Sequence, residues 1–100
     1  WDELAVRYFQ DNWDLKLLLV LIDIRRNPGS EEKMLLNLAR KDSIKTAVIA
    51  TKADKLSLSG RMKRAKEIRE AVGVEPIPAS SHSRIGVEEI WERIIYETSV

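Results

Sequence analysis

Three short polar segments follow apolar stretches of the chain and hold most of the side chains that could do chemistry. They are residues 23–25, residues 51–54 and residues 79–82. In an open sheet of parallel strands, ligands bind beyond the carboxyl ends of the strands, and each of these segments falls at such a position. We therefore expect a ligand site where the three segments meet.

The second segment, Thr51-Lys52-Ala53-Asp54, has side chains suited to a purine base. Asp54 offers two acceptor oxygens and no donor, while guanine presents adjacent N1–H and N2–H₂ donors. Adenine has an acceptor at N1 and would leave this carboxylate unpaired, a difference that can discriminate by about 10⁴-fold. Lys52 can lay its methylene chain along the purine face. The spacing alone also permits another interpretation, in which Lys52 and Asp54 cap the next helix and form a surface ion pair.

The composition excludes several classes of active site. The chain has no cysteine and one histidine, His82, which excludes disulfides, thiolate nucleophiles and metal sites built on several such ligands. A Ser/His/Asp hydrolase would need Ser80 or Ser81 with His82 and Asp23, but adjacent residues of one loop rarely converge and no G-x-S-x-G sequence is present. We interpret His82 as a solvated loop residue, with a position beside the base as the alternative, and Asp23 as a strand-end turn residue rather than a ligand. The formal net charge of +1 argues against an extended nucleic-acid surface.

Hydrophobic periodicity predicts the elements that position these segments. Stripes with a helical period predict helices, and short apolar runs predict strands buried between two layers. The expected order is helix 1–12, strand 17–22, helix 30–41, strand 44–50, helix 60–72, strand 74–78 and a helix from residue 87 onward. The first helix depends on a stripe of Trp1, Leu4, Ala5, Tyr8 and Phe9. Gly73 is expected to form a left-handed cap at the end of the third helix.

Alternating helices and strands predict the fold class. Parallel strands joined by helical crossovers give an α/β fold of three layers, with three parallel strands and helices on both faces. A chain of 100 residues supports a single core, so we expect one domain. The longest apolar run, residues 17–22, is too short to span a bilayer, and no signal peptide or membrane segment is expected.

Several motifs resemble those of one family of P-loop GTPases. Residues 49–55 look like the (N/T)KxD guanine-specificity motif in its threonine form, and residues 21–28 resemble an L-x-D-x-R-x-x-P segment. Residues 79–81, followed by Gly86 and Glu88-Glu89-Ile90-Trp91, are similar to an (F/A)SS…G…ELW segment. The three matches occur in the order and spacing of the EngB (YihA/YsxC) family over nearly all 100 residues. The resemblance implies the C-terminal half of a P-loop GTPase-like sheet.

The resemblance also implies a function and a set of site residues. It implies recognition of the guanine base of GTP or GDP, with Ser80 supporting Asp54 and the Ser81 backbone N–H donating to guanine O6. The base-binding residues would then be Thr51, Lys52, Ala53, Asp54, Ala79, Ser80 and Ser81. By family, we expect a cytoplasmic protein that acts in assembly of the large ribosomal subunit and in cell division or septation, with the large subunit or its rRNA as partner.

The chain departs from the family pattern by what it lacks. It contains no G-x-x-x-x-G-K-[ST] sequence to hold phosphates, and the D-x-x-G segment and switch threonine are absent. It also begins at Trp1 rather than at methionine. We therefore expect residues 1–100 to be the C-terminal part of a single G domain, missing its N-terminal half. Mg²⁺ would bind only in the full-length domain, and this chain would have no catalytic residues and would not hydrolyse GTP alone.

Two further expectations concern surfaces. The basic residues Arg61, Lys63, Arg64, Lys66 and Arg69 form either a solvated helix face or a contact for rRNA phosphates. The alternative function is therefore a non-enzymatic α/β interaction domain that docks RNA or protein through helix 61–72. If the P-loop strand of the resembled fold is missing beside residues 17–22, this strand becomes an apolar edge, and we expect the isolated chain to be molten, to aggregate or to pair through this strand.

Overall fold

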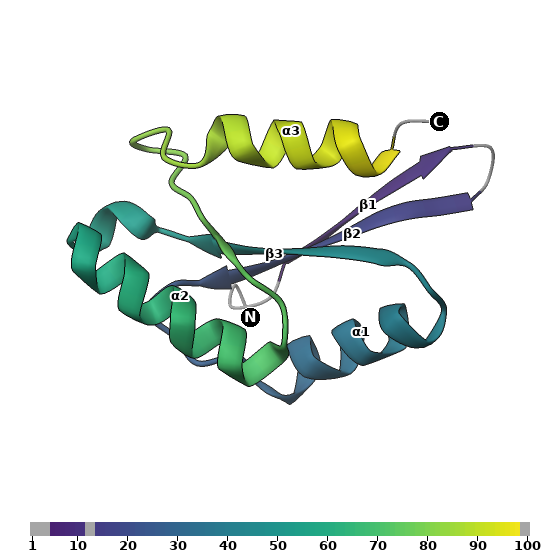
Figure 1. The fold of residues 1–100 in the computed structure, drawn as a ribbon, viewed down its shortest axis with the longest axis horizontal. Helices are drawn as coiled ribbons and strands as arrows, with labels where there is room; N and C mark the ends of the chain where they lie inside the picture. The colour runs from purple at the N-terminus through teal and green to yellow at the C-terminus, as the bar shows by residue number, and fades with distance from the viewer. Residues whose placement is uncertain (1–4, 12–13, 99–100) are drawn as a thin grey trace.

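The computed structural model describes residues 5–11 and 14–98, which form a central sheet with helices on both faces (Figure 1). Two strands open the described chain, and helices and strands alternate after them. In chain order the elements are β1 Ala5–Asp11, β2 Asp14–Asp23, α1 Ser30–Lys41, β3 Lys45–Thr51, a 3₁₀ turn η1 Ala53–Lys55, α2 Leu58–Val72, β4 Ile77–Pro78 and α3 Val87–Thr98. The expected α/β fold with three parallel strands is confirmed.

The parallel part of the sheet brings the polar segments to one edge. The strand order is β1-β2-β3-β4, with β2, β3 and β4 parallel. The register pairs Asp23 with Thr51 at the ends of β2 and β3, and Ala50 with Pro78 at the end of β4. Because the carboxyl ends of parallel strands share one edge, the segments that follow all three strands leave the sheet on the same side.

Strand β4 is shorter than the sequence predicts. We expected a strand over residues 74–78, but only Ile77–Pro78 pairs with β3. Prolines at positions 76 and 78 have no backbone N–H to donate to a ladder, which limits pairing to the edge of the sheet.

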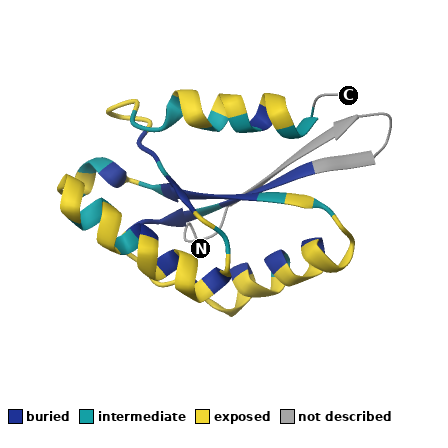
Figure 2. Ribbon diagram, viewed as in Figure 1, coloured by how far each residue is buried: buried dark blue, intermediate teal, exposed yellow. Residues whose placement is uncertain are grey.

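Side-chain alternation along β2 builds the two cores of the three-layer fold. Leu18, Val20 and Ile22 point to one face, where α1 and α2 pack, and Leu17 and Leu19 point to the other, where α3 contributes Ile94. Figure 2 shows the buried stripes of α1 and α2 below the sheet and that of α3 above it. Since β2 is buried on both faces, its continuous apolar sequence follows from its position in the sheet.

The first predicted helix is wrong. Residues 5–11 form strand β1, antiparallel to β2 with Ala5 opposite Leu21 and Asp11 opposite Asp14; Trp1 and Leu4 lie outside the described residues. The segment is rich in Val, Tyr and Phe, which favour strands, and β2 offers it a ladder of backbone partners. A helix-period stripe of nine residues is too short to override that pairing.

The expected exposed edge at residues 17–22 is corrected by the same strand. Strand β1 pairs with β2 along Leu17 to Leu21, so β2 is an interior strand and Leu17–Val20 are buried. The predicted aggregation through this edge therefore has no structural basis. None of the helices in the described part of the chain is long and apolar enough to cross a membrane.

Candidate functional site

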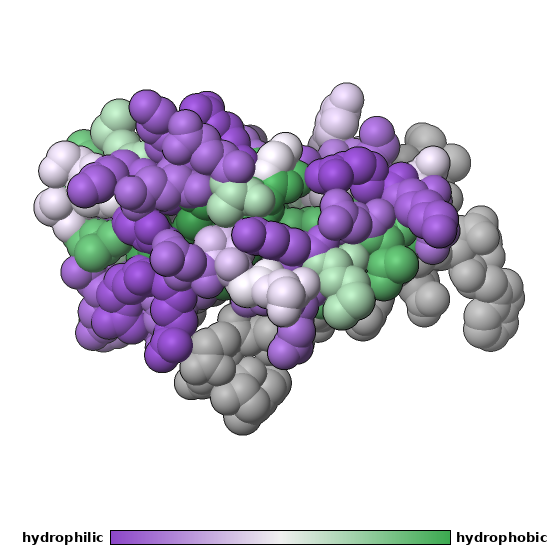
Figure 3. All heavy atoms as spheres, turned by 90° about the horizontal axis from the view of Figure 1, so that it is seen from below, coloured by the Kyte–Doolittle hydropathy of each residue, from purple (hydrophilic) through white to green (hydrophobic). Residues whose placement is uncertain are grey.

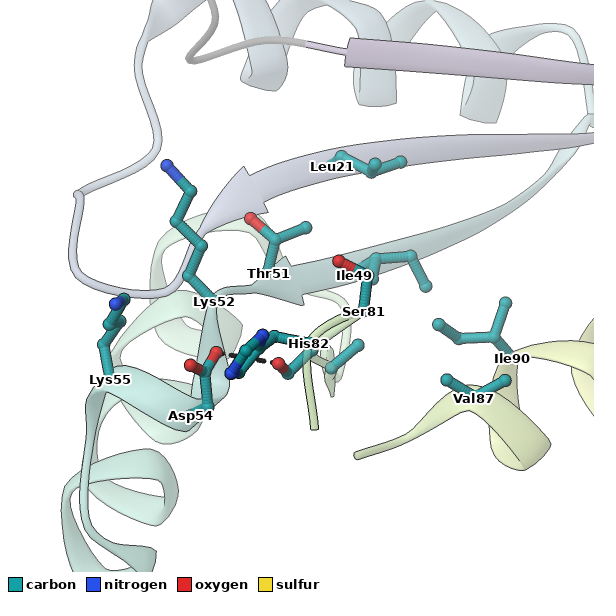
Figure 4. A pocket seen from close by; sticks show the side chains of 12 residues that line it. Leu21, Ile49, Thr51, Lys52, Asp54, Lys55, Ser81, His82, Val87 and Ile90 are labelled. Carbon is teal, nitrogen blue, oxygen red and sulfur yellow. Dashed lines mark hydrogen bonds between the residues drawn. The ribbon is translucent and has the colours of Figure 1, made fainter. Parts of the chain in front are cut away.

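A cavity of about 650 Å³ opens at the carboxyl edge of the sheet (Figure 4). It lies between the ends of β2 and β3, the loop after β4 and the first turns of α3. One wall is apolar and comes from Leu21, Ile49, Val87 and Ile90. The polar lining consists of Thr51, Lys52, Asp54, Lys55, Ser80, Ser81 and His82, and Ala79 also lines the cavity. The predicted meeting of the second and third polar segments is therefore found.

Asp54 is held at this cavity by Ser80. The Ser80 hydroxyl donates to Asp54 Oδ1 at 2.7 Å, and the same hydroxyl oxygen accepts from the Ser83 backbone N–H at 3.1 Å. Because Ser83 contributes a donor, the hydroxyl proton is directed to Asp54. This bond stabilises the ionised carboxylate and holds the pKa of Asp54 below its ordinary value. Ser80 and the Asp54 backbone N–H use part of the roughly four lone-pair sites of this carboxylate, so acceptor capacity is left for a ligand in the cavity that Asp54 lines.

Backbone bonds fix the two loops that carry this pair. The Ala53 N–H donates to the Ala79 carbonyl at 2.9 Å, and the Ala79 N–H donates to the Ala50 carbonyl at 2.8 Å. Ser80 is 3% exposed and its N–H donates to the Ile85 carbonyl at 2.9 Å. These backbone hydrogen bonds hold the loop after β4 beside the end of β3, so that Ser80 lies next to Asp54.

Gly86 allows the loop to return to α3. Its φ is +74°, and an added Cβ would lie 2.2 Å from the Pro78 carbonyl oxygen, too close for any side chain. The glycine that contributes to the resemblance is therefore required where the end of the loop passes the end of β4.

Lys52 has an unusual backbone and an ion pair outside the cavity. Its φ of +61° and ψ of 34° place it in the left-handed region. Its Nζ lies 3.7 Å from Asp23 Oδ2, and the side chain extends away from Asp54 (Figure 4). The alternative interpretation of Lys52 and Asp54 as helix caps is wrong, because Ser57 caps α2 by accepting from the Gly60 N–H at 3.2 Å.

Asp23 is 9% exposed, and hydrogen bonds from its own turn reach both of its carboxylate oxygens. Its Oδ1 accepts from the Arg25 backbone N–H at 2.9 Å and from Arg25 Nε at 3.1 Å, while Oδ2 accepts from Arg25 Nη2 at 2.9 Å. Hydrogen bonds from Arg25 lower the pKa of Asp23 to about 2, against the opposing effect of burial. The interpretation of Asp23 as a turn residue fits this geometry.

The remaining predicted residues take distinct positions. Thr51 lines the cavity and donates through Oγ1 to the Ile22 carbonyl at 3.3 Å, which fastens the ends of β2 and β3. Ser81 and His82 are exposed on its rim, as expected for His82. Ala53 is buried behind the site rather than in its lining.

Sequence reasoning missed the apolar wall and Lys55 of the cavity. The sequence contained a signal for Leu21 and Ile49. Side chains alternate along a strand, so these two residues point to the sheet face opposite to the one that α1 and α2 cover. Val87 and Ile90 were assigned to a core stripe of the last helix, and the same stripe also borders the cavity.

Part of the basic face of α2 is used inside the molecule. Arg64 donates to the carbonyls of Ile24 and Arg26, both at 2.7 Å, and Arg61 Nε donates to the Ala53 carbonyl at 2.8 Å. Arg69 pairs with Glu75 at 3.3 Å. Figure 3 views this side of the molecule, which is largely hydrophilic with scattered apolar side chains. The interpretation of helix 61–72 as an rRNA contact loses support because two of its cations hold loops in place.

Comparison with known proteins gives one consistent result. The chain is 34% identical over 99 residues to the probable GTP-binding protein EngB of Clostridioides difficile, and 34% identical over 98 residues to that of Alkaliphilus oremlandii. The EngB of Bacillus cereus strain B4264 is 31% identical over 98 residues. The resemblance to EngB proteins is confirmed. These alignments cover 94–95% of the chain but 47–50% of each EngB protein, so the chain spans about half the length of the curated relatives it matches. No protein-family model matches the chain.

Proposed function

We propose that the cavity binds the guanine base of GTP or GDP. The observation that carries the proposal is the Asp54 carboxylate, ionised and oriented by the Ser80 hydroxyl beside an apolar wall. Such a carboxylate can accept from N1–H and N2–H₂ of guanine together, whereas adenine would leave it unpaired. The EngB relatives, named as probable GTP-binding proteins, support the same ligand.

The size and lining of the cavity support a base as the ligand. Small-molecule sites of about 300–1,000 Å³ are typically apolar with a few placed polar groups, and this cavity of about 650 Å³ has that character. Leu21, Ile49 and Ile90 offer a surface for a flat ring, and the methylene chain of Lys52 forms part of the lining. The Ser81 backbone N–H remains our candidate donor to guanine O6.

The wider role is proposed from the resemblance. We assign residues 1–100 to the C-terminal part of an EngB-type G domain acting in the cytoplasm in large-subunit assembly and, by family, in cell division, with the large ribosomal subunit as partner. The described residues contain no group of three or more His, Asp or Glu side chains that could hold a metal ion. Phosphate and Mg²⁺ binding would belong to the other half of that domain.

The test is an NMR chemical-shift titration with guanosine, adenosine and xanthosine 5′-monophosphates. Without phosphate-binding residues, we expect the wild-type chain to bind GMP with a dissociation constant in the millimolar range, about −4 kcal/mol, and to prefer it over AMP. Asp54→Asn should reduce GMP affinity about tenfold or more and favour xanthosine monophosphate, because an Asn amide can donate to the xanthine C2 carbonyl.

The matched control is Asp42→Asn, the same chemical change at an exposed residue beyond the end of α1. It should leave all three affinities unchanged. Equal binding of GMP by wild type and Asp54→Asn would overturn the proposed function.

A further inference from the structure

Asp23 lies outside the lining of the cavity but contacts a residue that forms part of it. That residue is Lys52, which lines the cavity, whereas Asp23 is not part of the lining. We propose that Asp23 is a positioning residue for base binding, which holds the Lys52 side chain at the cavity mouth by pairing with its ammonium group. The inference rests on the proposed function, since it concerns how the same site is shaped.

Both ends of the Lys52 side chain are restrained. At the backbone end, the Thr51 carbonyl accepts from the Ile24 N–H and the Ala53 N–H donates to the Ala79 carbonyl, both at 2.9 Å, so the peptides on either side of Lys52 are fixed. At the other end, Nζ lies 3.7 Å from Asp23 Oδ2. A methylene chain tied at both ends keeps fewer rotamers, so less conformational entropy is lost when a ligand packs against it.

The left-handed backbone of Lys52 supports this role. A non-glycine residue with φ of +61° is held in a costly conformation by its surroundings, and such residues cluster at ligand sites. This conformation also determines where the side chain leaves the strand end. In Figure 4, Lys52 and Asp54 leave the same segment in different directions, so they border different sides of the cavity.

Arg25 and Arg64 determine what happens when Asp23 is changed. Arg25 shares Oδ2 of Asp23 with Lys52, at 2.9 Å against 3.7 Å, so the carboxylate bridges two cations. Independently, Arg64 on α2 binds the carbonyls of Ile24 and Arg26. Because Arg64 holds the turn through its backbone, we expect the turn to keep its path when Asp23 loses its charge.

The experiment measures GMP affinity for wild type, Asp23→Asn, Lys52→Met and the double variant. Asp23→Asn removes a negative charge near an anionic ligand, so a purely electrostatic effect would tighten GMP binding. The positioning role predicts the opposite, a weakening of about threefold, because Lys52 loses its anchor. In the Lys52→Met background, Asp23→Asn should no longer weaken GMP binding, since the residue through which it acts is gone.

Lys63→Met is the matched control, because it removes another exposed cation that lies outside the cavity lining and has no pairing with Asp23 among the described contacts. If the control variant lost as much GMP affinity as Lys52→Met does, charge alone would explain the loss and the inference would be overturned. Unchanged or tighter GMP binding by Asp23→Asn, or effects of Asp23→Asn and Lys52→Met that multiply, would also overturn it. If wild type shows no preference for GMP over AMP, the proposed function fails instead. Lys52 is exposed, so its variant keeps the test valid even if Asp23→Asn unfolds.

Discussion

Asp23 and Asp54 are two carboxylates at the same edge of the sheet with opposite surroundings. Asp23 is buried and bridges Arg25 and Lys52, so its charge is neutralised within the chain. Asp54 is half-buried, and its carboxylate accepts from the neutral Ser80 hydroxyl and from its own backbone N–H. A carboxylate whose acceptors are taken by cations can shape a site, whereas one that is oriented by neutral donors and keeps some acceptor capacity is suited to bind a ligand.

The largest expected effect is the loss of stability in Gly86→Ala, which alters the loop that presents Ser80 to Asp54. The added Cβ would lie 2.2 Å from the Pro78 carbonyl oxygen and φ is positive, so we expect a loss of more than about 2 kcal/mol in the free energy of unfolding. Urea denaturation measures this loss. Gly73→Ala is the control, because Gly73 has a similar φ of +78° and an added Cβ would lie 3.7 Å from its nearest neighbour, Arg40 Nη2. A loss no larger than that of Gly73→Ala would mean that the contact with Pro78 is unimportant.

Lowering the pH should reduce the free energy of unfolding through protonation of Asp23. The pKa of Asp23 is about 2 in the folded chain and 3.8 ordinarily, so its stabilising effect is fully present above pH 5 and is lost as pH falls toward 2. The loss should be about 1–2 kcal/mol, given that Arg25 is partly exposed. Urea denaturation between pH 6 and pH 2 measures it. Asp23→Asn should be less stable at pH 6 and lose less stability on acidification; parallel curves for the two proteins would contradict the assignment.

Ser80→Ala should have a smaller effect, which concerns the ionisation and orientation of the Asp54 carboxylate rather than the fold. Without the hydroxyl donor, the pKa of Asp54 should rise toward its ordinary value. An NMR pH titration of the Asp54 side-chain carboxyl carbon measures this change. Ser81→Ala is the control, since the hydroxyl that contacts Asp54 belongs to Ser80. An unchanged Asp54 titration in Ser80→Ala would show that the hydrogen bond does not orient this carboxylate.

Local patterns predicted most of the fold and the Asp54 side of the site. The apolar runs of β2 and β3, the helical stripes and the cap at Gly73, whose φ is +78°, depend on neighbours in sequence. The carboxyl-edge rule then placed Asp54 near Ser80. The Ser80–Asp54 contact had been expected from the resemblance, and the structure contains it.

The errors and omissions arise where distant segments decide. Residues 5–11 form a strand because β2 supplies partners, which a helical period in the same residues does not reveal. The contact between Lys52 and Asp23 depends on the register of two strands. Arg61 and Arg64 were interpreted as surface cations, yet each binds main-chain carbonyls of other segments, and a long flexible side chain gives no sequence signal for that.

The bonds of Arg64 have a consequence for the order of folding. They join residues 38 and 40 positions apart, and the Ser80–Asp54 bond spans 26 positions. Contacts of such separation form after local helices and turns, because a long loop must close before they can contribute. During synthesis, the turn after β2 can be fastened only once α2 has left the ribosome, and the Asp54 carboxylate only once residue 83 has followed. The cavity is therefore completed by residues 79–90, and a nascent chain can form it only after these residues have been synthesised.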